Sequence, residues 1–380
     1  QRCNLDCTLC YLSESSESVK DTPLPILFER IDRIRADYGA GVSVQVTGGD
    51  PTLRDRAELV AIVKRVAERG LRPSLFTNGI KATRDLLREL ADAGLFDVAF
   101  HVDTTQRRKR FPTEVSLNAI RREYIERARG LGIAVVFNTS VHGGNLDEIP
   151  DLARFFLEHA DVVGMASFQV QAATGRGEWQ RRAPEVTMAA IRERITAAVG
   201  EGALAWNAAL LGHPDCHEAT MLATFGGRAV DVLADQALYE SFLEQMKDVP
   251  FDRRDVKGTA RRIVLALARQ PWWVLRGGRF LLARLWRVRR EILARKKTGK
   301  ITFFIQNFMD ADALDPERIA NCSFMVMTDD GPVSMCAHNA RRDDYILKPL
   351  ALPAAGGAGV WDPRTGVLAL PSRPAARAAS

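Results

Sequence analysis

The sequence has few of the residues and runs that define several protein classes. Only six of its 380 residues are cysteine and 7% are aromatic. No run approaches the ~18 consecutive apolar residues that a membrane-spanning helix needs. Six cysteines are too few for a disulfide scaffold of this length. We therefore expect neither a membrane-spanning chain nor a disulfide-stabilised one.

The first residues also lack the features of a secretory signal. They contain no basic segment followed by an apolar stretch, and the chain begins with Gln1 instead of methionine. From the first feature we expect a reducing cytoplasm, and from the second a fragment or a processed form. The hydrophobic fraction of 46% and the charged fraction of 26% indicate a globular protein and exclude a disordered one.

Positive charge is concentrated in one segment. The whole chain has a formal net charge of +6, whereas residues 256–300 contain fourteen Lys or Arg and one acid, Glu291, which gives +13 and leaves −7 for the rest. A uniformly basic chain would favour nucleic acid, but a single basic segment favours a local surface. We therefore expect no nucleic-acid partner.

The basic segment has the pattern of an amphipathic helix. Its apolar positions are Leu281, Leu285, Val288 and Ile292, and its basic ones are Arg284, Arg287, Arg290 and Arg295, with Arg289 on the apolar side. A helix with Trp and Leu on one face and Arg on the other can lie on an anionic membrane surface, as a peripheral protein does. The alternative is a helix packed on its own domain with solvated arginines, and the sequence does not decide between them.

Helices and strands alternate from Pro23 to about residue 165. Helices are expected at 26–38, 54–69, 84–93, 117–131 and 149–159, and strands at 42–46, 73–76, 98–102, 134–140 and 163–171. This alternation predicts an α/β fold with right-handed crossovers and a parallel sheet. Ligands of such sheets bind at the carboxyl ends of the strands.

The pattern changes after Gly175. We expect a helix at 186–199, mostly helical structure at 216–247, and strands at 301–308 and 324–328 in a small C-terminal module. The last thirty residues are rich in Ala, Pro, Gly and Arg, which favours a disordered tail.

Three of the six cysteines lie within the first ten residues. Cys3, Cys7 and Cys10 have the spacing C-x3-C-x2-C. Three thiolates on a short loop can bind three irons of a [4Fe–4S] cluster and leave the fourth iron open, whereas zinc sites more often use paired cysteines and four protein ligands. The alternative is a zinc knuckle or three unrelated cysteines.

This motif resembles the signature of the radical S-adenosylmethionine (SAM) superfamily. The family usually has an aromatic residue before the last cysteine, where this chain has Leu9, and here the aromatic is Tyr11. The resemblance implies a cluster that chelates SAM, a reducing donor such as flavodoxin or ferredoxin, and cleavage of SAM to a 5′-deoxyadenosyl radical that abstracts hydrogen from an unreactive C–H. It also implies a partial (β/α)6, TIM-like barrel, whose first strand should precede Cys3 and is missing here.

A second motif, Thr47-Gly48-Gly49-Asp50-Pro51, follows the strand expected at 42–46. It resembles the family's GGE-type motif, with Asp in place of Glu. Two glycines let the backbone approach a ligand closely. The resemblance implies that Gly48, Gly49 and Asp50 hold the amino group of SAM, and the alternative is a simple turn.

Polar residues after the later strands are further candidates for SAM binding. They are Thr77, Asn78, His101, Asp103, Asn138, Ser140 and Gln171, the last opening a segment that runs to Gly177. By resemblance, the later strands reach the ribose, carboxylate and adenine of SAM. Each residue is equally compatible with a structural role.

The other three cysteines suggest a second site. Cys322, Gly331 and Cys336 have the spacing C-x8-G-x4-C, which predicts a hairpin turning at 329–331 with a cysteine on each strand. This resembles the hairpin that holds an auxiliary [4Fe–4S] cluster, for which Cys216 is the third ligand. The alternative is buried free thiols. The fourth iron is then open, held by the region before Cys3, or bound by His213, His217 or His338.

A narrower resemblance rests on residues 303–310, on the Cys322–Cys336 hairpin and on His338-Asn339. It points to the branch with tetraether lipid synthases and radical SAM pterin methylases. The first hypothesis is C–C bond formation on a lipid chain, favoured by the Trp- and Arg-rich segment; the second is a pterin methylase or a peptide maturase. A third, a metal-stabilised nucleic-acid-binding module, would leave Thr47–Asp50 unexplained.

The expected organisation follows from these motifs. It comprises a radical SAM core at 1–178, a mostly helical bridge at 179–255, the basic amphipathic segment at 256–300, an α+β auxiliary-cluster module at 301–350 and the disordered tail at 351–380.

Overall fold

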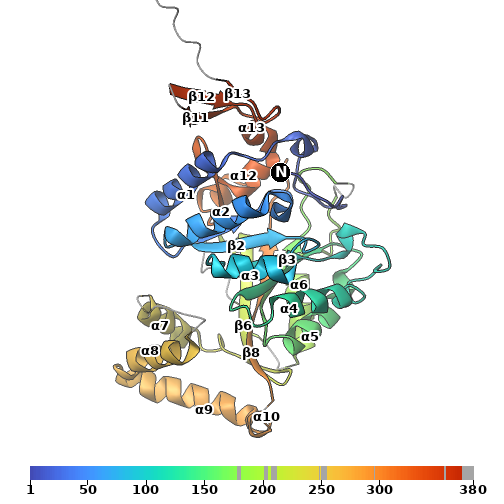
Figure 1. Ribbon diagram of the computed structural model, residues 1–380. Coiled ribbons are helices and arrows are strands. Elements are labelled where there is room, and N and C mark those ends of the chain that lie inside the picture. The colour runs from blue at the N-terminus through green and yellow to red at the C-terminus, as the bar shows by residue number, and fades with distance from the viewer. Residues whose placement is uncertain are drawn as a thin grey trace, which may run out of the picture.

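The centre of the molecule is an eight-stranded sheet with the order β1-β2-β3-β4-β5-β8-β6-β7 (Figure 1). The computed structural model describes residues 1–177, 181–200, 204–206, 212–247, 249, 255–294, 296–354 and 357–369. The strands are β1 Ser43–Val46, β2 Arg72–Thr77, β3 Asp97–His101, β4 Ala134–Val141, β5 Val163–Val170, β6 His217–Phe225, β7 Arg228–Asp231 and β8 Thr298–Asn307. Strands β1 to β5 and β8 run parallel, and β6 and β7 are antiparallel.

Helices connect the successive parallel strands. They are α1 Leu24–Tyr38, α2 Arg56–Glu68, α3 Arg84–Asp92, α4 Asn118–Ala128, α5 Ile149–Glu158 and α6 Met188–Val199. Side-chain caps begin several of them, because the oxygens of Asp55, Thr83 and Thr187 accept the backbone N–H three residues later. The predicted α/β alternation is confirmed within about two residues at most boundaries.

A row of aromatic rings forms the centre of the core. Successive ring centroids of Phe100, Phe137, Phe156, Phe168 and Phe303 lie 5.7, 5.5, 6.5 and 6.4 Å apart. The row spans β3, β4, α5, β5 and β8, so that strands distant in sequence share one packed interior. All five side chains are fully buried, and each stabilises the fold by about 1.5–3 kcal/mol.

The sheet's sixth parallel strand comes from late in the chain. We predicted that residues 301–308 belong to the C-terminal module, but β8 pairs in parallel with β5, from Met165↔Thr302 to Val170↔Asn307. Its alternating Ile301, Phe303 and Ile305 are buried in the core. The prediction was wrong because periodicity identifies a strand but not its partner across a long insertion.

Within that insertion, β6 and β7 replace part of the predicted helical structure. A hairpin joins them through Gly226 and Gly227, which have φ of 60° and 84°. Burial alternates along β6 from Thr220 onward, but three of the buried side chains of this strand are His217, Thr220 and Thr224. Polar residues on the inner face hid the strand pattern, and the prediction of mostly helical structure is wrong for 217–225 and 228–231. The structure does confirm a helix, α7 Gln236–Met246.

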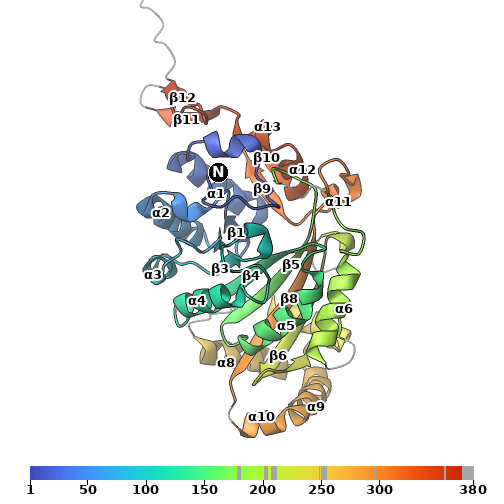
Figure 2. The same cartoon turned by 90° about the vertical axis from the view of Figure 1, so that its right-hand side faces the viewer.

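The basic segment forms a layer of helices at one end of the sheet. These are α8 Val256–Ala268, the π-helical turn η6 Trp273–Gly277, α9 Gly278–Arg287 and α10 Arg289–Leu293. In two perpendicular views α8, α9 and α10 lie at the end of the molecule opposite the N-terminus (Figures 1 and 2). None of the helices that the structure describes is long and apolar enough to cross a membrane. Arg295 lies outside the described residues, as does residue 178, the expected end of the core.

The C-terminal module contains the predicted hairpin, with β9 Met325–Thr328 antiparallel to β10 Gly331–Ser334. Its cysteines do not lie on the strands as predicted, because Cys322 precedes β9 and Cys336 lies in α12 Met335–Ala340. The hairpin strands are only four residues long, so both cysteines fall beyond them. Short helices α11 Pro316–Ala320 and α13 Arg342–Ile346 flank this module.

The predicted disordered tail contains a small sheet. Strands β11 Leu350–Ala354, β12 Gly357–Trp361 and β13 Leu368–Ala369 are antiparallel neighbours. Leu350 and Trp361 are buried against Ile26 of α1, and this apolar contact stabilises a segment that composition alone indicated to be disordered. The prediction is wrong for these strands, and residues 370–380 lie outside the described part of the chain.

Candidate functional site

The loop of Cys3, Cys7 and Cys10 lies across the carboxyl ends of three neighbouring strands. Backbone N–H of Asp50, after β1, donates to the carbonyl of Arg2 at 2.7 Å. The amide of Asn78, after β2, donates to Oδ1 of Asn4 at 2.6 Å. Thr8 N–H donates to the carbonyl of Thr105, after β3, at 2.9 Å. The cysteine loop is therefore held at the sheet edge where parallel sheets bind ligands.

The three thiols of this loop form one group. Burial raises the pKa of the Cys7 thiol, and the nearby charges of Asp103, Cys10 and Cys3 raise it further. Burial likewise raises the pKa of Cys3, with smaller contributions from Asp50 and Cys10 among others. All three cysteines are free and half-buried. A bound metal would favour the deprotonated form of these side chains, as it does for coordinating thiols.

The donor set fits an iron–sulfur cluster better than a single ion. In the described ranges no three or more His, Cys, Asp or Glu side chains are close enough to share one metal ion. A cubane cluster takes each thiolate on a different iron, so its ligands do not need to converge on one point. Three thiols on one short loop match that requirement, whereas a structural zinc site needs four convergent ligands.

Tyr11, immediately after Cys10, connects the two sequence motifs. Its hydroxyl donates to the carbonyl of Gly48 at 2.8 Å and lies 3.2 Å from the hydroxyl of Thr47. The guanidinium of Arg342 lies 4.9 Å from the centre of its ring. The sequence marked Tyr11 only as a displaced aromatic, and the structure gives it a part in positioning the glycine motif.

The two glycines of that motif have different surroundings. A Cβ atom on Gly49 would lie 1.9 Å from the carbonyl oxygen of Arg2, so only glycine allows this approach of two backbones. Gly48 has a φ of +147°, a conformation that favours glycine, and a Cβ there would find no atom nearer than 3.7 Å. A side chain at Gly48 would therefore meet Gln1 at ordinary van der Waals distance, whereas Gly49 is required by the close approach of the cysteine loop.

The carboxylate of Asp50 is buried and occupied by internal donors. It accepts from the hydroxyl of Thr77 at 2.9 Å, from Asn78 N–H at 2.8 Å, and from Thr52 N–H at 3.0 Å and its hydroxyl. A carboxylate has about four acceptor positions. In this arrangement Asp50 ties the ends of β1 and β2 together, and a direct contact with SAM requires one of these donors to move.

A second buried acid, Asp103, organises the ends of β3 and β4. Its carboxylate lies 2.7 Å from Nε2 of His101 and accepts from Ser140 N–H at 2.8 Å and from Thr105 N–H at 3.0 Å. Burial opposes its ionisation, but His101 and these donors outweigh burial and hold the pKa of Asp103 well below its usual range. Burial also opposes protonation of His101, yet Asp103 raises the pKa of the imidazole. His101 and Asp103 therefore form an ion pair, and the negative charge of Asp103 raises the pKa of the Cys7 thiol.

Sequence reasoning missed a fully buried ion pair next to this group. Arg121 Nη2 lies 2.5 Å from Oε2 of Glu114, and both side chains have no exposed surface. Arg121 also donates to the carbonyl of Val102 at 2.7 Å, and Glu114 accepts from Thr104 N–H at 2.8 Å and from Asn145 at 2.9 Å. The pair holds the segments after β3 and β4. No local pattern marks it, because its members lie on a loop and a helix.

The remaining candidates lie along the same edge. Asn138 is buried in β4, in register with His101 and Ser167. Gln171 follows β5, and its amide donates to the carbonyl of Arg181 at 2.9 Å.

The segment after β5 closes over the cysteine loop. Cβ atoms on Gly175 and Gly177 would lie 2.3 Å from the carbonyl oxygen of Cys10 and 2.7 Å from that of Thr8. Arg176, between them, forms an isolated β-bridge with Cys10. The end of β5 therefore helps to hold the cysteine loop.

Cys216, Cys322 and Cys336 form a second group of thiols at this end of the sheet. The backbone N–H of Met309, just after β8, donates to Sγ of Cys336 at 3.4 Å. Burial raises the pKa of Cys336, and the charges of Cys322 and Cys216 act in the same direction. Arg318 approaches Sγ of Cys216 at 3.4 Å and lowers the pKa of Cys336. The fold thus brings Cys216 toward two cysteines that lie more than a hundred residues later in the chain.

The three candidate fourth ligands have different surroundings. His213 Nδ1 accepts from Asp215 N–H at 3.2 Å, and the ring of His217 stacks on Phe304 with centroids 5.4 Å apart. Burial lowers the pKa of His338 to about 4, and its Nδ1 is buried without a hydrogen-bond partner. None of the three is joined to the second thiol group by a hydrogen bond that the structure records, so the choice among them stays open.

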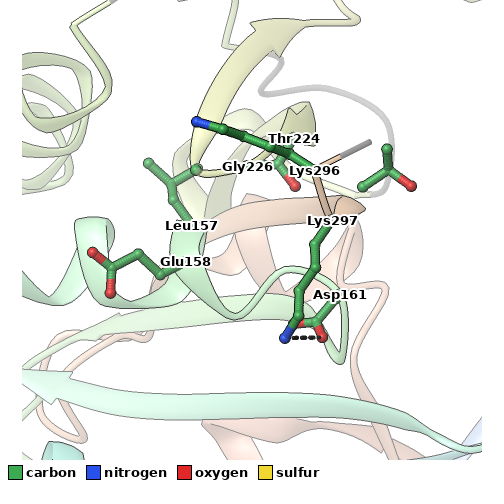
Figure 3. Close-up of a pocket in the computed structure, with 9 residues that line it drawn as sticks. Leu157, Glu158, Asp161, Thr224, Gly226, Lys296 and Lys297 are labelled. Atoms are coloured by element: carbon green, nitrogen blue, oxygen red, sulfur yellow. Dashed lines mark ion pairs between the residues drawn. The ribbon is translucent and has the colours of Figure 1, made fainter. Parts of the chain in front are cut away.

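A cavity of about 290 Å³ lies at the opposite, amino end of the strands (Figure 3). It is lined by Leu157, Glu158 and Asp161 before β5, by the β6–β7 turn, and by Lys296 and Lys297 before β8. Lys297 lies 3.4 Å from the carboxylate of Asp161. This cavity contains none of the predicted site residues.

Comparisons with known proteins agree with the geometry of the cysteine loop. Residues 1–156 match the family model of the Radical SAM superfamily. The chain is 29% identical over 181 residues to a 7,8-dihydro-6-hydroxymethylpterin dimethyltransferase of Methanocaldococcus jannaschii, covering 46% of this chain and 35% of that protein. A PqqA peptide cyclase of Bradyrhizobium diazoefficiens is 30% identical over 172 residues, covering 44% of each. A GTP 3′,8-cyclase of Aquifex aeolicus is 34% identical over 164 residues, covering 41% of this chain and 50% of that protein.

The chain spans about a third to a half of the length of these relatives. A crystal structure of SuiB from Streptococcus suis aligns with 16% identity over 51% of this chain and 42% of that chain, with a TM-score of 0.39. A similarity of that size gives no information about ligand or reaction. The family match and the cysteine loop at the carboxyl edge of a parallel sheet together confirm the resemblance: residues 1–156 of this chain are a radical SAM superfamily domain.

Proposed function

We propose that Cys3, Cys7 and Cys10 hold a [4Fe–4S] cluster and that the chain binds SAM beside it. Membership in the superfamily implies both the cluster and SAM. When bound, the cluster supplies the electron that cleaves SAM to a 5′-deoxyadenosyl radical, which functionalises an unactivated C–H. The observation that carries this proposal is the attachment of the cysteine loop to the ends of β1, β2 and β3, where the SAM candidates also lie.

The residues of the chain then divide into two roles. The candidates for contacts with SAM are Gly48, Thr77, Asn78, Asn138, Ser140 and Gln171. Asp50 and Asp103 act as positioning residues, because their carboxylates already accept several internal hydrogen bonds.

Basic side chains around the loop suit a buried group with negative charge. Arg108 lowers the pKa of Cys7, and Arg176 is itself affected by the charge of Cys10. Arg342 lies over Tyr11 and is also affected by Cys10. Three thiolates outweigh the positive charge of an oxidised [4Fe–4S] core, and these guanidinium groups would offset the remaining negative charge.

The second thiol group supports a proposal of an auxiliary cluster. Cys216, Cys322 and Cys336 repeat the composition of the first group, three thiols with an adjacent guanidinium, here that of Arg318. Both groups lie at the carboxyl edge of the same sheet. We assign to the second group a [4Fe–4S] cluster with a fourth iron that is open or held by a ligand not yet identified.

For the reaction we propose C–C bond formation or methyl transfer, with a reducing protein such as flavodoxin or ferredoxin as electron donor. Among substrate classes, the relatives named as a pterin dimethyltransferase and a peptide cyclase support a pterin or a peptide. A lipid chain is the second candidate, and the observation that favours it is the basic, apolar helical layer. That layer lies at the end of the molecule away from the cysteine loop, so it does not line the substrate site (Figures 1 and 2).

The test is the iron content after anaerobic reconstitution, with EPR of the reduced protein with and without SAM. We expect about eight irons per chain and a cluster signal that SAM perturbs. About four irons would remove the auxiliary cluster and keep the class, and zinc without iron would overturn the whole proposal.

Two matched variants separate the clusters. Cys7→Ala should lose about four irons and all 5′-deoxyadenosine formation, measured by chromatography. Cys322→Ala should lose the other four and keep SAM cleavage, but abolish product formation. Full product formation by Cys322→Ala would contradict the role of the second group.

Candidate substrates distinguish the classes. With methyl-labelled SAM, mass spectrometry of incubations containing a reduced pterin, a peptide or a phospholipid reports which one changes mass: methyl transfer adds the label, and C–C coupling removes two hydrogens. A phospholipid that changes mass beside an unchanged pterin and peptide would reverse our order of preference.

A further inference from the structure

The helical layer at the amino end of the sheet exposes an unusual amount of apolar surface. Among the described residues, eighteen large hydrophobic side chains are exposed, and ten of them lie between residues 264 and 293. These ten are Val264, Leu265, Trp272, Val274, Leu275, Leu281, Leu282, Trp286, Ile292 and Leu293. Single exposed hydrophobic residues are ordinary, but such a concentration marks an interaction surface.

The most exposed side chains of the layer form one stripe. Leu275, Leu282, Trp286 and Leu293 are 71%, 69%, 68% and 81% exposed. They lie in three successive elements, η6, α9 and α10, and their spacings of seven, four and seven residues match the period of one helix face. Val288, in contrast, is fully buried and turns the opposite side toward the protein. The helical wheel predicted an apolar face that included Val288, so the stripe is a second apolar surface that the wheel did not identify.

Arginines flank this stripe. Arg279, Arg289 and Arg290 are exposed, and the guanidinium of Arg289 lies 4.3 Å from the centre of the Trp286 ring. The single acid of residues 256–300, Glu291, is partly buried and lies 3.5 Å from Arg228 of β7. The negative charge of Glu291 is therefore paired with Arg228 of the sheet. The charges that this part of the layer exposes to solvent are the positive charges of its arginines.

We propose that this docking face, defined by Leu275, Leu282, Trp286 and Leu293 with Arg279, Arg289 and Arg290, binds the surface of an anionic phospholipid bilayer. Leucine and tryptophan side chains enter the boundary between headgroups and acyl chains, and arginines pair with lipid phosphates. Tryptophan with an adjacent arginine suits this boundary, where one end of a side chain is apolar and the other hydrated.

Charge and chemistry favour a bilayer over other occupants. A second copy of the chain would bring two segments of formal charge +13 together, and like charges across an interface weaken association. Nucleic acid would pair with the arginines and stack on Trp286, but would leave the three exposed leucines of the stripe in water. An anionic bilayer satisfies both the charge and the apolar stripe.

The position of the face has a consequence for the whole enzyme. It lies at the amino end of the sheet, because α10 leads directly into β8 and Glu291 contacts the start of β7. The cysteine loop lies at the carboxyl end, so docking anchors the protein with its candidate site facing away from the bilayer (Figure 2). This inference does not depend on the proposed reaction, since binding requires neither cluster nor SAM.

The experiment is flotation of the full chain with vesicles, combined with tryptophan fluorescence. Vesicles of phosphatidylcholine with an equal part of phosphatidylglycerol should carry the protein and shift its emission to the blue, and raising the salt concentration should release it. Vesicles of phosphatidylcholine alone should carry much less. Equal binding to both compositions, or binding to neither, overturns the proposal.

Paired variants locate the binding face. Arg279→Gln with Arg290→Gln should lower the partition coefficient by about thirtyfold, since each basic side chain near an anionic surface contributes a factor of about five. Arg35→Gln with Lys64→Gln, exposed on α1 and α2, is the control for net charge. Leu282→Ser with Trp286→Ser should lower the partition coefficient by at least about tenfold. Its control is Val360→Ser with Val367→Ser, which are exposed far from the layer.

Equal losses in the controls and the face variants overturn the assignment to this face. Circular dichroism and iron content of each variant must match the parent, which separates lost docking from lost folding. Light scattering measures whether the parent forms a dimer. A dimer that dissociates in the variant Leu282→Ser with Trp286→Ser would assign the face to a second copy of the chain and overturn the proposal. Retention on single-stranded RNA without vesicle binding overturns it in favour of nucleic acid.

Discussion

The two ends of the central sheet hold their polar groups in opposite ways. At the carboxyl end, Asp50 and Asp103 are buried and each accepts several hydrogen bonds from the chain itself. At the amino end, Arg279 and Arg290 lie exposed beside Leu282 and Trp286. Buried and fully bonded groups fix a geometry, which a cofactor site requires. Exposed cations and apolar side chains suit a partner that adapts to them, as a lipid surface does.

The largest expected change in the free energy of unfolding tests whether the carboxyl end of the sheet depends on its buried ion pairs and hydrogen bonds. Arg121→Met leaves Glu114 as an unpaired buried acid, and breaking such a pair costs about 3–5 kcal/mol. Arg154→Met, which breaks the exposed pair with Asp151, should cost less than about 1 kcal/mol. Urea unfolding under reducing conditions measures both. Equal losses for the two variants would show that the buried pair has no special part in holding this end.

The next effect concerns the pH dependence contributed by His101 and Asp103. The folded pKa of Asp103 is lowered, so its stabilisation is present above the unfolded pKa of about 3.9 and is lost as pH falls toward the folded value. The folded pKa of His101 is raised, so its stabilisation is complete below about 6.5 and is lost as pH rises through the folded value. The pair therefore stabilises most between about pH 4 and 6.5.

Asp103→Asn should remove this dependence. The free energy of unfolding of the parent should fall between about pH 6 and pH 8 relative to that of the variant, because only the parent loses the imidazolium–carboxylate pair over that range. Asp151→Asn, an exposed partner of Arg154, is the control. Parallel pH profiles of parent and Asp103→Asn would show that the pair is not charged in the folded protein.

A smaller effect is expected at Tyr11. Tyr11→Phe removes the hydroxyl that bonds to Gly48 and lies near Thr47, and a hydrogen bond of this kind contributes about 1 kcal/mol. Since the bond connects the cysteine loop to the glycine motif, the loss should appear as an approximately fivefold weaker binding of SAM, measured by calorimetry on the reconstituted protein. Tyr38→Phe, on an exposed tyrosine of α1, should leave the affinity unchanged. Unchanged affinity in Tyr11→Phe would separate the tyrosine from SAM binding.

Some strands and site residues could be predicted from the sequence and others could not, for physical reasons. Periodicity identified β1 to β5, because their apolar runs are local and bounded by helices. It missed β6, whose inward face includes His217 and Thr220, and misplaced β8, whose pairing with β5 is a long-range contact. Motif spacing marked Cys3, Cys7 and Cys10 as candidates. It could not find Glu114 with Arg121, since nothing in the sequence around either residue marks a buried ion pair.

The smallest expected change in the free energy of unfolding is at the exposed stripe of the amino end, and it tests most directly whether the two ends of the sheet differ. Leu282→Ser with Trp286→Ser should change the free energy of unfolding by no more than about 0.5 kcal/mol, because both side chains are already in water. The same change in chemistry at Leu87, which is fully buried in α3, should cost several kcal/mol, as large-to-small core substitutions do. Thermal and urea unfolding of the two variants, in the absence of vesicles, measure the difference. A large loss for the exposed pair would mean that the stripe packs within the protein in solution. In that case the amino end, like the carboxyl end, would be held by internal contacts.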